Sequence, residues 1–499
     1  MSTNMHSAIV IGAGISGLKS SIELNKNGID TIILEARDRL GGRLHTVTTE
    51  SGLKLDLGAS WMHDCLYNPL LKKSIEKGNV KYYFDNGKFT FHDKDLGIVD
   101  DNHKLHPVVQ EMSDYLQFVC GQLSHSDDVS VKNAALRYLQ DKKATLTETQ
   151  IKLAPQLLRY YEMWIGSSWN VLSARLISGD AHLGRDAMVT NGYRTIYDNE
   201  LEELYEVVGT RDVVGSYIKL QKVVFAIEFS EETRKICVKT RDYSGNVESF
   251  YSDYLICSVP LSVLKLEDKS EKGHIEWNPP LPKTITSKLK GLSYSHLGKV
   301  FFEFDSPFWP TDADRFFCIP QNDEQMTYSV QTNANVTFDN LKIDPVLNRT
   351  PTPWTLPVLF LNINRGTGKP VILALTSNPL TEYVETHSFE EFWPIFRAGL
   401  ASISNLQESQ VPIAKDVVKS EWNNDPYARG SYLGCAVGDL IDEALEALTD
   451  AQDIFDGRGR VRFVGEALAE QGNGCAHGAW MTAARESEKI VKLANRGKL

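Results

Sequence analysis

Residues 8–43, AIVIGAGISGLKSSIELNKNGIDTIILEARDRLGGR, decide the fold of this chain. The apolar run Ala8–Ile11 predicts a buried parallel strand. Three glycines follow with the spacing G-x-G-x-x-G, and a helix is expected to begin near Ile15. A second strand is expected over Thr31–Leu34, with Glu35 at its end. This order of parts is typical of a dinucleotide-binding βαβ unit, in which the helix N-terminus faces the phosphates.

The residues of this motif have separate physical roles. Gly12 permits the tight turn, Gly14 lets the backbone approach a pyrophosphate, and Gly17 allows the helix to pack closely on the strand. Glu35 lies near the offset of roughly 20 residues expected for an acid that binds a ribose hydroxyl. A second glycine pair before Arg43 is unnecessary for NAD and resembles a motif of two-domain flavoproteins, so the sequence favours FAD over NAD.

The composition narrows the class of protein. A length of 499 residues suits two or three domains, and the 42% hydrophobic and 24% charged content is ordinary for a globular protein. The formal net charge of −12 argues against a nucleic-acid partner and suits a cationic substrate. The seven cysteines include no C-x-x-C pair, so we expect neither a disulfide framework nor a metal site.

We expect a cytoplasmic protein without a membrane partner. No run of about 18 apolar residues predicts a membrane span. The first predicted strand begins too early to leave room for a signal peptide. The final Gly-Lys-Leu loosely resembles the peroxisomal address Ser-Lys-Leu, which makes the peroxisome the minor alternative.

The later segments predict that pieces of two domains alternate along the chain. Residues 80–210 are expected to be mainly helical, with a capping box at Thr147 and Gln150. Residues 217–258 are expected to form a three-stranded meander, with strands at 217–228, 235–240 and 247–251, and then a buried strand from Leu255. Further expected elements are strands at 298–304, 371–375 and 460–466, and helices at 151–164, 388–403 and 474–495.

The predicted fold is α/β, with a doubly wound, Rossmann-type FAD-binding domain and an inserted α+β substrate-binding domain. Such a sheet accepts insertions at its loops. The FAD-binding domain is expected to comprise residues 1–80, 211–289 and 416–499. The substrate domain is expected to comprise residues 81–210 and 290–415.

Landmarks along essentially the whole chain resemble the FAD-dependent amine oxidase family, and within it the fungal polyamine oxidases. They are GAGISGLKS, LEARDRLGGRLHTV, DLGASWMHD, EMWIGSSWNVLSA, LGKVFFEF, EWNNDPYARGSY, and RFVGE followed by GCAHGAW. The resemblance implies the two-domain fold of that family and oxidation of an amine by bound FAD.

The resemblance also implies which residues bind FAD. It assigns the backbone of Val224 to the adenine, Glu466 to the ribityl and phosphate region, and the helix opening at Cys475 to the isoalloxazine ring. Ser431 stands where monoamine oxidases have the cysteine that bonds to FAD, and a serine cannot form that thioether, so noncovalent FAD is predicted. The implied cofactor residues are Gly12, Ala13, Gly14, Ser16, Gly17, Glu35, Ala36, Arg37, Arg43, Gly58, Ala59, Ser60, Trp61, Val224, Trp422, Glu466, Cys475 and Ala476.

Lys299 is the leading catalytic candidate. It stands in a predicted strand beside Val300 and Phe301. Strand alternation by itself points such a side chain outward as often as inward. The resemblance implies that the matching lysine reaches the flavin N5 through a water, with a role in positioning that water or in flavin reoxidation.

The resemblance adds His63, His182 and Tyr432 to the catalytic set, and Trp61 and Trp169 as aromatic walls of a substrate tunnel. Without it, a lone histidine would be interpreted as a surface or packing residue, and these aromatic residues as core. The implied substrate contacts are Ser60, His63, Trp169, His182, Tyr432 and Cys475.

The predicted function is an FAD-dependent polyamine oxidase that uses oxygen. It would convert spermine, N-acetylated polyamines, or both to a shorter polyamine, an aminoaldehyde and hydrogen peroxide. Met62 and Asp186 depart from the expected pattern and leave the choice among polyamines open. The alternatives are an oxidase of monoamines or of a lysine side chain, and a flavin-carrying protein that binds a steroid or another apolar ligand.

Overall fold

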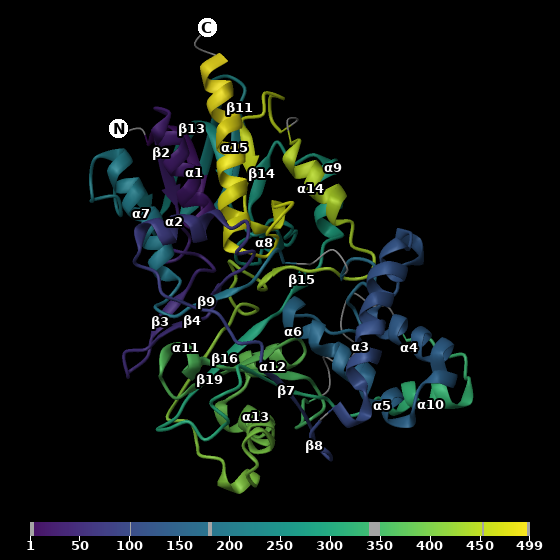
Figure 1. The fold of residues 1–499 in the computed structure, drawn as a ribbon. Helices are drawn as coiled ribbons and strands as arrows, with labels where there is room; N and C mark the ends of the chain where they lie inside the picture. Colours follow the sequence, from purple (N-terminus) through teal and green to yellow (C-terminus); the bar gives the residue numbers. More distant parts are fainter. Residues whose placement is uncertain (1–3, 100, 178–181, 339–349, 452–453, 497–499) are drawn as a thin grey trace.

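The computed structural model describes residues 4–99, 101–177, 182–338, 350–451 and 454–496, and it contains two large sheets in different parts of the molecule (Figure 1). In the upper sheet of Figure 1, the parallel neighbours of β1 (Met5–Ile11) are β2 (Thr31–Leu34) and β13 (Val247–Cys257). Helix α1 (Ile15–Lys26) connects β1 to β2, and β22 (Val461–Phe463) pairs in parallel with β13. The predicted βαβ unit and the late parallel strand are confirmed.

The meander continues this eight-stranded sheet, in which seven strands run β10–β2–β1–β13–β12–β11–β14 and the eighth, β22, pairs with β13 outside this order. The predicted strand over 217–228 is interrupted, because Gln221 has a φ of +55°. The predicted strands at 247–251 and from Leu255 are the single strand β13, since residues 252–254 include no glycine or proline to end it. The remaining strands are β10 (Ile218–Lys219), β11 (Val223–Ser230), β12 (Lys235–Arg241) and β14 (Glu276–Asn278).

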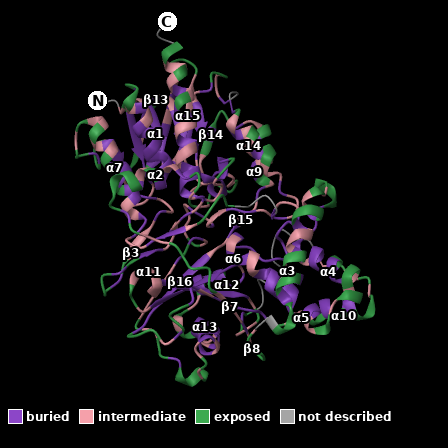
Figure 2. Ribbon diagram, viewed as in Figure 1, coloured by how far each residue is buried: buried purple, intermediate pink, exposed green. Residues whose placement is uncertain are grey.

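Helices cover both faces of this sheet, and Figure 2 shows its central strands as mainly buried. Ala8 and Val10 belong to the hydrophobic core on one face, whereas Ile9 and Ile11 belong to the core on the other. Because both faces of the sheet are buried, the sequences of its parallel strands are continuous apolar runs. The first face is covered by α1, α7 (Arg194–Val208) and α15 (Ala476–Arg496), and the second by α8 (Leu261–Leu264), α9 (Lys283–Lys290) and α14 (Ile441–Thr449).

The second sheet has seven strands in the order β20–β16–β19–β18–β17–β7–β8. The region 80–210 is mainly helical, but it also supplies β7 and β8, which the sequence did not predict. β7 pairs in parallel with β17, a partner far away along the chain, and no local pattern reveals such a pairing. The strands are β7 (Phe89–Asp93), β8 (Gly97–Ile98), β16 (Gly298–Glu303), β17 (Arg315–Cys318), β18 (Val358–Asn362), β19 (Val371–Thr376) and β20 (Asp416–Lys419). β20 lies in this sheet although residues 416–499 were assigned to the FAD-binding domain.

This sheet is also covered on both faces. Phe301 packs in one core and Phe302 in the other. The predicted helix at 151–164 is two helices, because residues 159–161 form a 3₁₀ turn. The first core includes α3 (Leu105–Asp114), α4 (Val131–Lys142), α5 (Glu148–Leu158), α6 (Glu162–Ile165) and α10 (Glu324–Thr332), and the second includes α12 (Leu380–Thr386) and α13 (Phe389–Ser404).

Short elements complete the fold between the two sheets and at their margins. They are β3 (Thr46–Thr48), β4 (Lys54–Asp56), β5 (Trp61–Met62), α2 (Pro69–Lys77), β6 (Tyr82–Tyr83), β9 (Ala187–Val189), β15 (Tyr294–Ser295), α11 (Ile363–Thr367) and β21 (Tyr432–Leu433). None of the helices in the described part of the chain combines the length and the apolar character needed to cross a bilayer.

The capping box of α5 gives a local stability prediction. The Thr147 hydroxyl accepts the Gln150 N–H at 3.2 Å, and the Gln150 side chain accepts the Thr147 N–H at 3.0 Å. Because Thr147 is exposed, Thr147→Ala should remove only this cap and lower the stability of the helix by about 1 kcal/mol. We expect hydrogen exchange in the first turns of α5 to become about fivefold faster. Thr149→Ala, within the first turn, should not accelerate exchange; equal acceleration in both variants would contradict the capping role.

Candidate functional site

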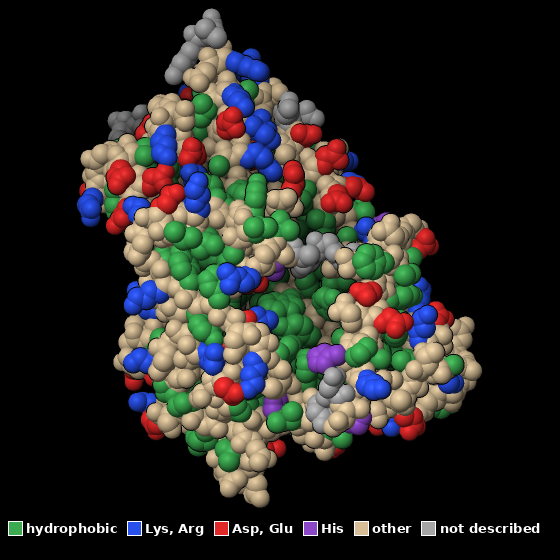
Figure 3. Space-filling view, in the orientation of Figure 1, with side chains coloured by type: hydrophobic (Ala, Val, Ile, Leu, Met, Phe, Trp, Pro, Cys, Tyr) green, Lys and Arg blue, Asp and Glu red, His purple; other side chains and the backbone are tan. Residues whose placement is uncertain are grey.

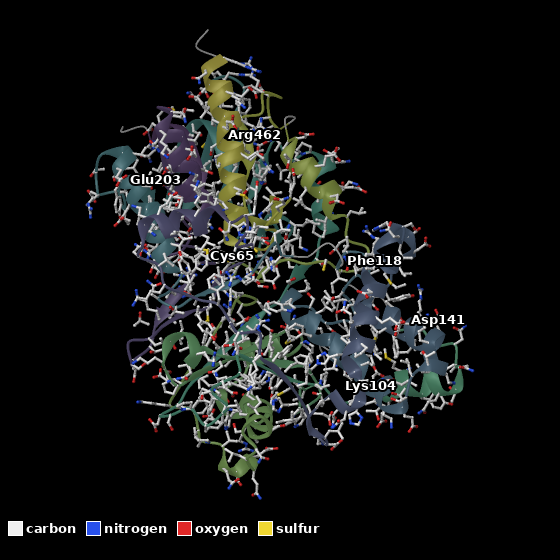
Figure 4. All side chains as sticks on the ribbon, viewed as in Figure 1. Cys65, Lys104, Phe118, Asp141, Glu203 and Arg462 are labelled. Atoms are coloured by element: carbon white, nitrogen blue, oxygen red, sulfur yellow. The ribbon has the colours of Figure 1, made fainter. Side chains whose placement is uncertain are left out.

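One large cavity lies where the two sheets approach each other. It has a volume of about 870 Å³, near the upper end of the roughly 300–1,000 Å³ typical of ligand pockets. The face seen in Figure 3 is hollowed at the waist of the molecule, and hydrophobic side chains gather there. Figure 4 places Cys65 near this waist and Phe118, Lys104 and Asp141 on the helical part to the side. The cavity is lined by residues from both sheets.

The glycine turn at one end of the cavity has the shape of a phosphate cradle. Gly12 has a φ of +97°, which favours glycine. A Cβ on Gly17 would lie 1.9 Å from the carbonyl oxygen of Gly12, so only glycine fits this helix–strand contact. A Cβ on Gly14 would meet nothing within 4 Å, because it would point into open space. The geometry therefore fits the predicted roles. Gly12 forms the tight turn, Gly14 leaves room for a pyrophosphate, and Gly17 allows the close helix–strand contact.

The buried carboxylate of Glu35 stands beside this turn. One oxygen accepts the Ala13 N–H at 2.7 Å and the other accepts the Arg37 N–H at 2.9 Å. Each carboxylate oxygen has a further lone pair, so Glu35 can also accept hydrogen bonds from ribose hydroxyls. Arg37 in turn donates to Asp425 at 2.7 Å, which ties this segment to a loop late in the chain.

Arg43 and Glu466 join the beginning and the end of the chain. Arg43 Nη1 donates to Glu466 Oε1 at 2.9 Å and to the Ser431 carbonyl at 2.8 Å. The other Glu466 oxygen accepts the Gly474 N–H at 3.1 Å, just before α15 begins. The Arg43 guanidinium and the N-terminus of α15 are groups that favour a phosphate, and Glu466 holds both of them in place.

The turn at Gly58 lies between the glycine turn and the second sheet. A Cβ on Gly58 would lie 1.6 Å from the Arg43 carbonyl oxygen, so the two segments are in direct backbone contact. The Trp422 indole N–H donates to the Leu57 carbonyl at 2.9 Å and holds the turn in place. On the opposite wall, the ladder between β11 and β12 shifts register after Val224, which gives this backbone an irregular geometry at the cavity.

Most of the predicted cofactor residues line the cavity. Ala13 and Gly17 are not among the lining residues, because they support the turn through its backbone. The residues that do line it are Gly12, Gly14, Ser16, Glu35, Ala36, Arg37, Arg43, Gly58, Ala59, Ser60, Trp61, Val224, Trp422, Glu466, Cys475 and Ala476.

Lys299 points into the cavity wall rather than to solvent. All six residues of β16 are buried, because the strand lies between β19 and β20 and is covered on both faces. The Lys299 ammonium donates to the carbonyls of Asp56 at 3.1 Å and Gly58 at 2.5 Å, and to the Ser60 hydroxyl. These acceptors match the three donors of an ammonium group.

The electrostatic environment of Lys299 is unusual. Burial lowers the pKa of Lys299 to about 8, against the opposing effect of the Asp56 carboxylate. Burial also raises the pKa of Asp56 to about 6, although hydrogen bonds and Lys299 favour its charged form. The Lys299 nitrogen lies 5.2 Å from the Trp61 ring centre. A buried lysine with a strongly lowered pKa on a cavity wall is typical of a functional site.

Two histidines stack on each other at the cavity. The rings of His63 and His182 are 4.4 Å apart at their centres and nearly parallel. His63 Nδ1 lies 3.2 Å from Asp186, and His182 Nδ1 lies 3.3 Å from Asp64. Asp64 also lies 3.0 Å from Nε2 of the buried His477. Both predicted histidines are therefore brought together, each with its own carboxylate.

The predicted aromatic residues are placed differently from one another. Tyr432 lines the cavity, and its hydroxyl donates to the Trp164 carbonyl. Trp61 also lines it, but Trp169 does not. Trp169 is instead buried near the cationic groups of Lys132 and Arg159, so the expectation that it forms a tunnel wall is wrong. Trp164 lines the cavity as well.

Comparisons with known proteins agree with this architecture. A family model described as flavin-containing amine oxidoreductase matches residues 15–491. A corticosteroid-binding protein of Candida albicans is 30% identical over 98% of this chain and 96% of its own length. A probable polyamine oxidase 4 of Arabidopsis thaliana is 26% identical over 97% of this chain and 87% of its own. A solved putrescine oxidase bound to putrescine superposes with a TM-score of 0.67 and 17% identity, covering 98% of this chain and 99% of that one, which supports the fold.

Proposed function

The chain belongs to the flavin-containing amine oxidoreductase family, and we propose from this premise that it is a polyamine oxidase with oxygen as electron acceptor. The observation that supports the proposal is the continuity of the cavity. A single space extends from the glycine turn to Lys299 and to the stacked pair of His63 and His182. A cofactor bound at the first end could therefore meet an amine at the second.

FAD is the cofactor, and its chemistry is to accept a hydride from the carbon next to the amine nitrogen and to pass both electrons to oxygen. We propose that Gly12–Gly17 and Arg43 hold its phosphates and Glu35 a ribose. The substrate amine also loses one proton, so an imine forms, and water hydrolyses it to an aldehyde and a shorter amine. Oxygen takes up the two electrons and two protons as hydrogen peroxide.

The proposed roles of the substrate-facing residues follow from their charges. Asp186, which lines the cavity beside His63, favours a cationic amino group of a polyamine. The Trp61 and Tyr432 rings, with Ser60 and Cys475 nearby, would orient its alkyl segments and the carbon that reacts. The net charge of −12 favours approach of such a cation.

A cytoplasmic location remains our proposal, and microscopy of a fluorescent fusion protein would test it.

The proposal is tested by anaerobic reduction of the purified holoenzyme. Spermine, N-acetylspermine and spermidine should each be added without oxygen, with benzylamine as a monoamine control. We expect one or more of the polyamines to bleach the oxidised flavin spectrum faster than benzylamine, and readmitted oxygen to yield peroxide. If no polyamine bleaches the flavin, the proposed substrate class is wrong.

Noncovalent FAD is a separate prediction. The Ser431 hydroxyl donates to the Ser295 carbonyl at 2.9 Å and accepts the Leu297 N–H at 3.0 Å, and it cannot form a thioether. Acid precipitation should therefore release all the flavin absorbance into the supernatant. Colour that remains with the pellet, as it does for a covalent flavoprotein processed in parallel, would contradict this prediction.

A second candidate function is binding of an apolar ligand. It is favoured by the similarity to a corticosteroid-binding protein and by apolar residues such as Ile177, Met188 and Leu361 in the cavity wall. Equilibrium dialysis with a labelled corticosteroid, with and without spermine, separates the two functions. Saturable steroid binding without flavin bleaching by any amine would favour this candidate.

A further inference from the structure

We propose that the cavity contains a binding site for a divalent cation of the zinc class, formed by His63, His182 and Cys475. One ring nitrogen of each histidine and the Cys475 thiol all lie within 4.8 Å of one another. The three residues come from distant parts of the chain: the segment after β5, the segment before β9, and the residue before α15. The fold therefore assembles a set of ligands that has no spacing pattern in the sequence.

The donor set and its dimensions suit zinc. Zinc binds histidine nitrogen at roughly 2.0–2.1 Å and cysteine sulfur at about 2.3 Å in tetrahedral geometry. Ligand atoms around it are then about 3.3–3.6 Å apart. His63 is half-buried and His182 is exposed. Because the two rings are stacked nearly parallel, the His182 ring must turn out of the stack before a nitrogen of each ring can face the same ion. Two imidazoles and a thiolate favour zinc over magnesium or calcium, which prefer oxygen ligands.

The carboxylates around the histidines match the surroundings of known zinc-binding imidazoles. Zinc-bound histidines usually donate their second ring N–H to a carboxylate, which fixes the tautomer and the ring. Here Asp186 faces Nδ1 of His63, and Asp64 faces Nδ1 of His182. In this assignment Nδ1 of each ring faces its carboxylate, and Nε2 of each ring would bind the ion. Asp64 is itself held by the Leu183 N–H at 2.5 Å.

An alternative set around Cys475 is less suited to an ion. Asp64, His477 and Cys475 also bring their ligand atoms within 4.8 Å. Asp64 and His477 already contact each other at 3.0 Å, and both are buried. The backbone of Gly472 packs directly against the His477 ring, because a Cβ on Gly472 would lie 2.2 Å from the ring Nε2. We therefore assign Asp64 and His477 to supporting the ligands rather than to binding the ion.

The position of this site has a functional consequence. Three protein ligands leave a fourth position for water or an amine. An ion there would occupy the same space as the histidine contacts proposed for the substrate. Zinc should therefore inhibit amine oxidation competitively. The inhibition rests on the proposed function, whereas binding of the ion does not.

The test uses chelator-treated holoenzyme. We expect calorimetric titration to show one Zn²⁺ per chain, and Mg²⁺ not to compete. Bound Co²⁺ should give the intense visible bands of a tetrahedral site, at wavelengths beyond the flavin absorption, and Zn²⁺ should abolish them. His182→Ala and Cys475→Ser should each weaken Zn²⁺ binding by at least about tenfold. His125→Ala and Cys237→Ser, at residues that do not line the cavity, should not change it.

Each variant must first show wild-type flavin content and circular dichroism. If Cys475→Ser fails this check, the conclusion depends on the His182→Ala variant, because His182 is exposed. No Zn²⁺ binding by the wild-type holoenzyme, or undiminished binding in a correctly folded variant of a proposed ligand, would overturn the site. Zinc binding by a protein that oxidises no polyamine would leave the site in place and refute only the proposed function.

Discussion

Replacing Lys299 with methionine is expected to slow the reaction of the reduced enzyme with oxygen by about 10²- to 10³-fold while FAD stays bound. Methionine keeps an unbranched side chain in the wall but removes the positive charge. That charge is held by two backbone carbonyls and the Ser60 hydroxyl, and it lies buried in the cavity wall. A buried cation is suited to stabilising the negative charge that develops as oxygen is reduced.

The pH dependence provides a sharper test of Lys299. Its pKa of about 8 means that the ammonium form predominates below pH 8 and is lost above it. The wild-type rate constant should therefore fall as the pH rises through about 8, and the variant should lack this ionisation. Stopped-flow mixing of anaerobically reduced enzyme with oxygen over a series of pH values measures both quantities.

A lysine on the neighbouring strand is the matched control. Lys419 on β20 also donates to backbone carbonyls, at Val384 and Glu385, but it does not line the cavity. Lys419→Met should leave the oxygen reaction and its pH profile unchanged. A Lys299→Met enzyme that retained the ionisation near pH 8 would remove the role proposed for Lys299.

Gly17→Ala should abolish FAD binding by disrupting the fold around it. The new methyl carbon would lie 1.9 Å from the Gly12 carbonyl oxygen, and a backbone atom cannot move aside as a flexible side chain can. Helix α1 would have to move away from β1, at a cost of about 3 kcal/mol or more. We expect apoprotein that unfolds at a lower temperature and takes up little flavin.

Gly14→Ala separates cofactor binding from stability. Gly14 has an extended backbone with φ −73° and ψ 177°, which alanine adopts without strain, and its Cβ would meet nothing within 4 Å. The apoprotein should keep its melting temperature, whereas the methyl group should obstruct the pyrophosphate and weaken FAD binding by about tenfold or more. Thermal melts of apoprotein and fluorescence titration with FAD distinguish the two variants. Equal destabilisation by both would show that the roles assigned to the two glycines are wrong.

The sequence predicts well those features that are encoded locally. The strand, turn, helix and acid of the opening motif lie within residues 8–43, so their order alone defines the cradle. The capping box at Thr147 is likewise local. The orientation of Lys299 is different, because it depends on the packing of β16 between β19 and β20, and these two strands lie far along the chain. Alternation within one strand cannot reveal that both of its faces are buried.

The histidine cluster shows the same limit. Asp64 follows His63 directly, yet nothing local indicates that it contacts His182 and His477. Asp186 was recognised only as a departure from a pattern, and the structure explains its presence beside His63. Trp169 shows a related limit, because an aromatic residue suits a core as well as a tunnel wall, and only its burial in the folded chain shows that it belongs to the core.

The strand order of the upper sheet constrains how the protein is made on the ribosome. β1 is synthesised long before its neighbour β13 and the later strand β22, and α15 packs against α1 only after both strands. Glu466 and Cys475 therefore join the cavity after every strand of the second sheet has been synthesised. The nascent chain must keep its apolar strand β1 from aggregating during this interval, because the strands beside β1 are incomplete until then.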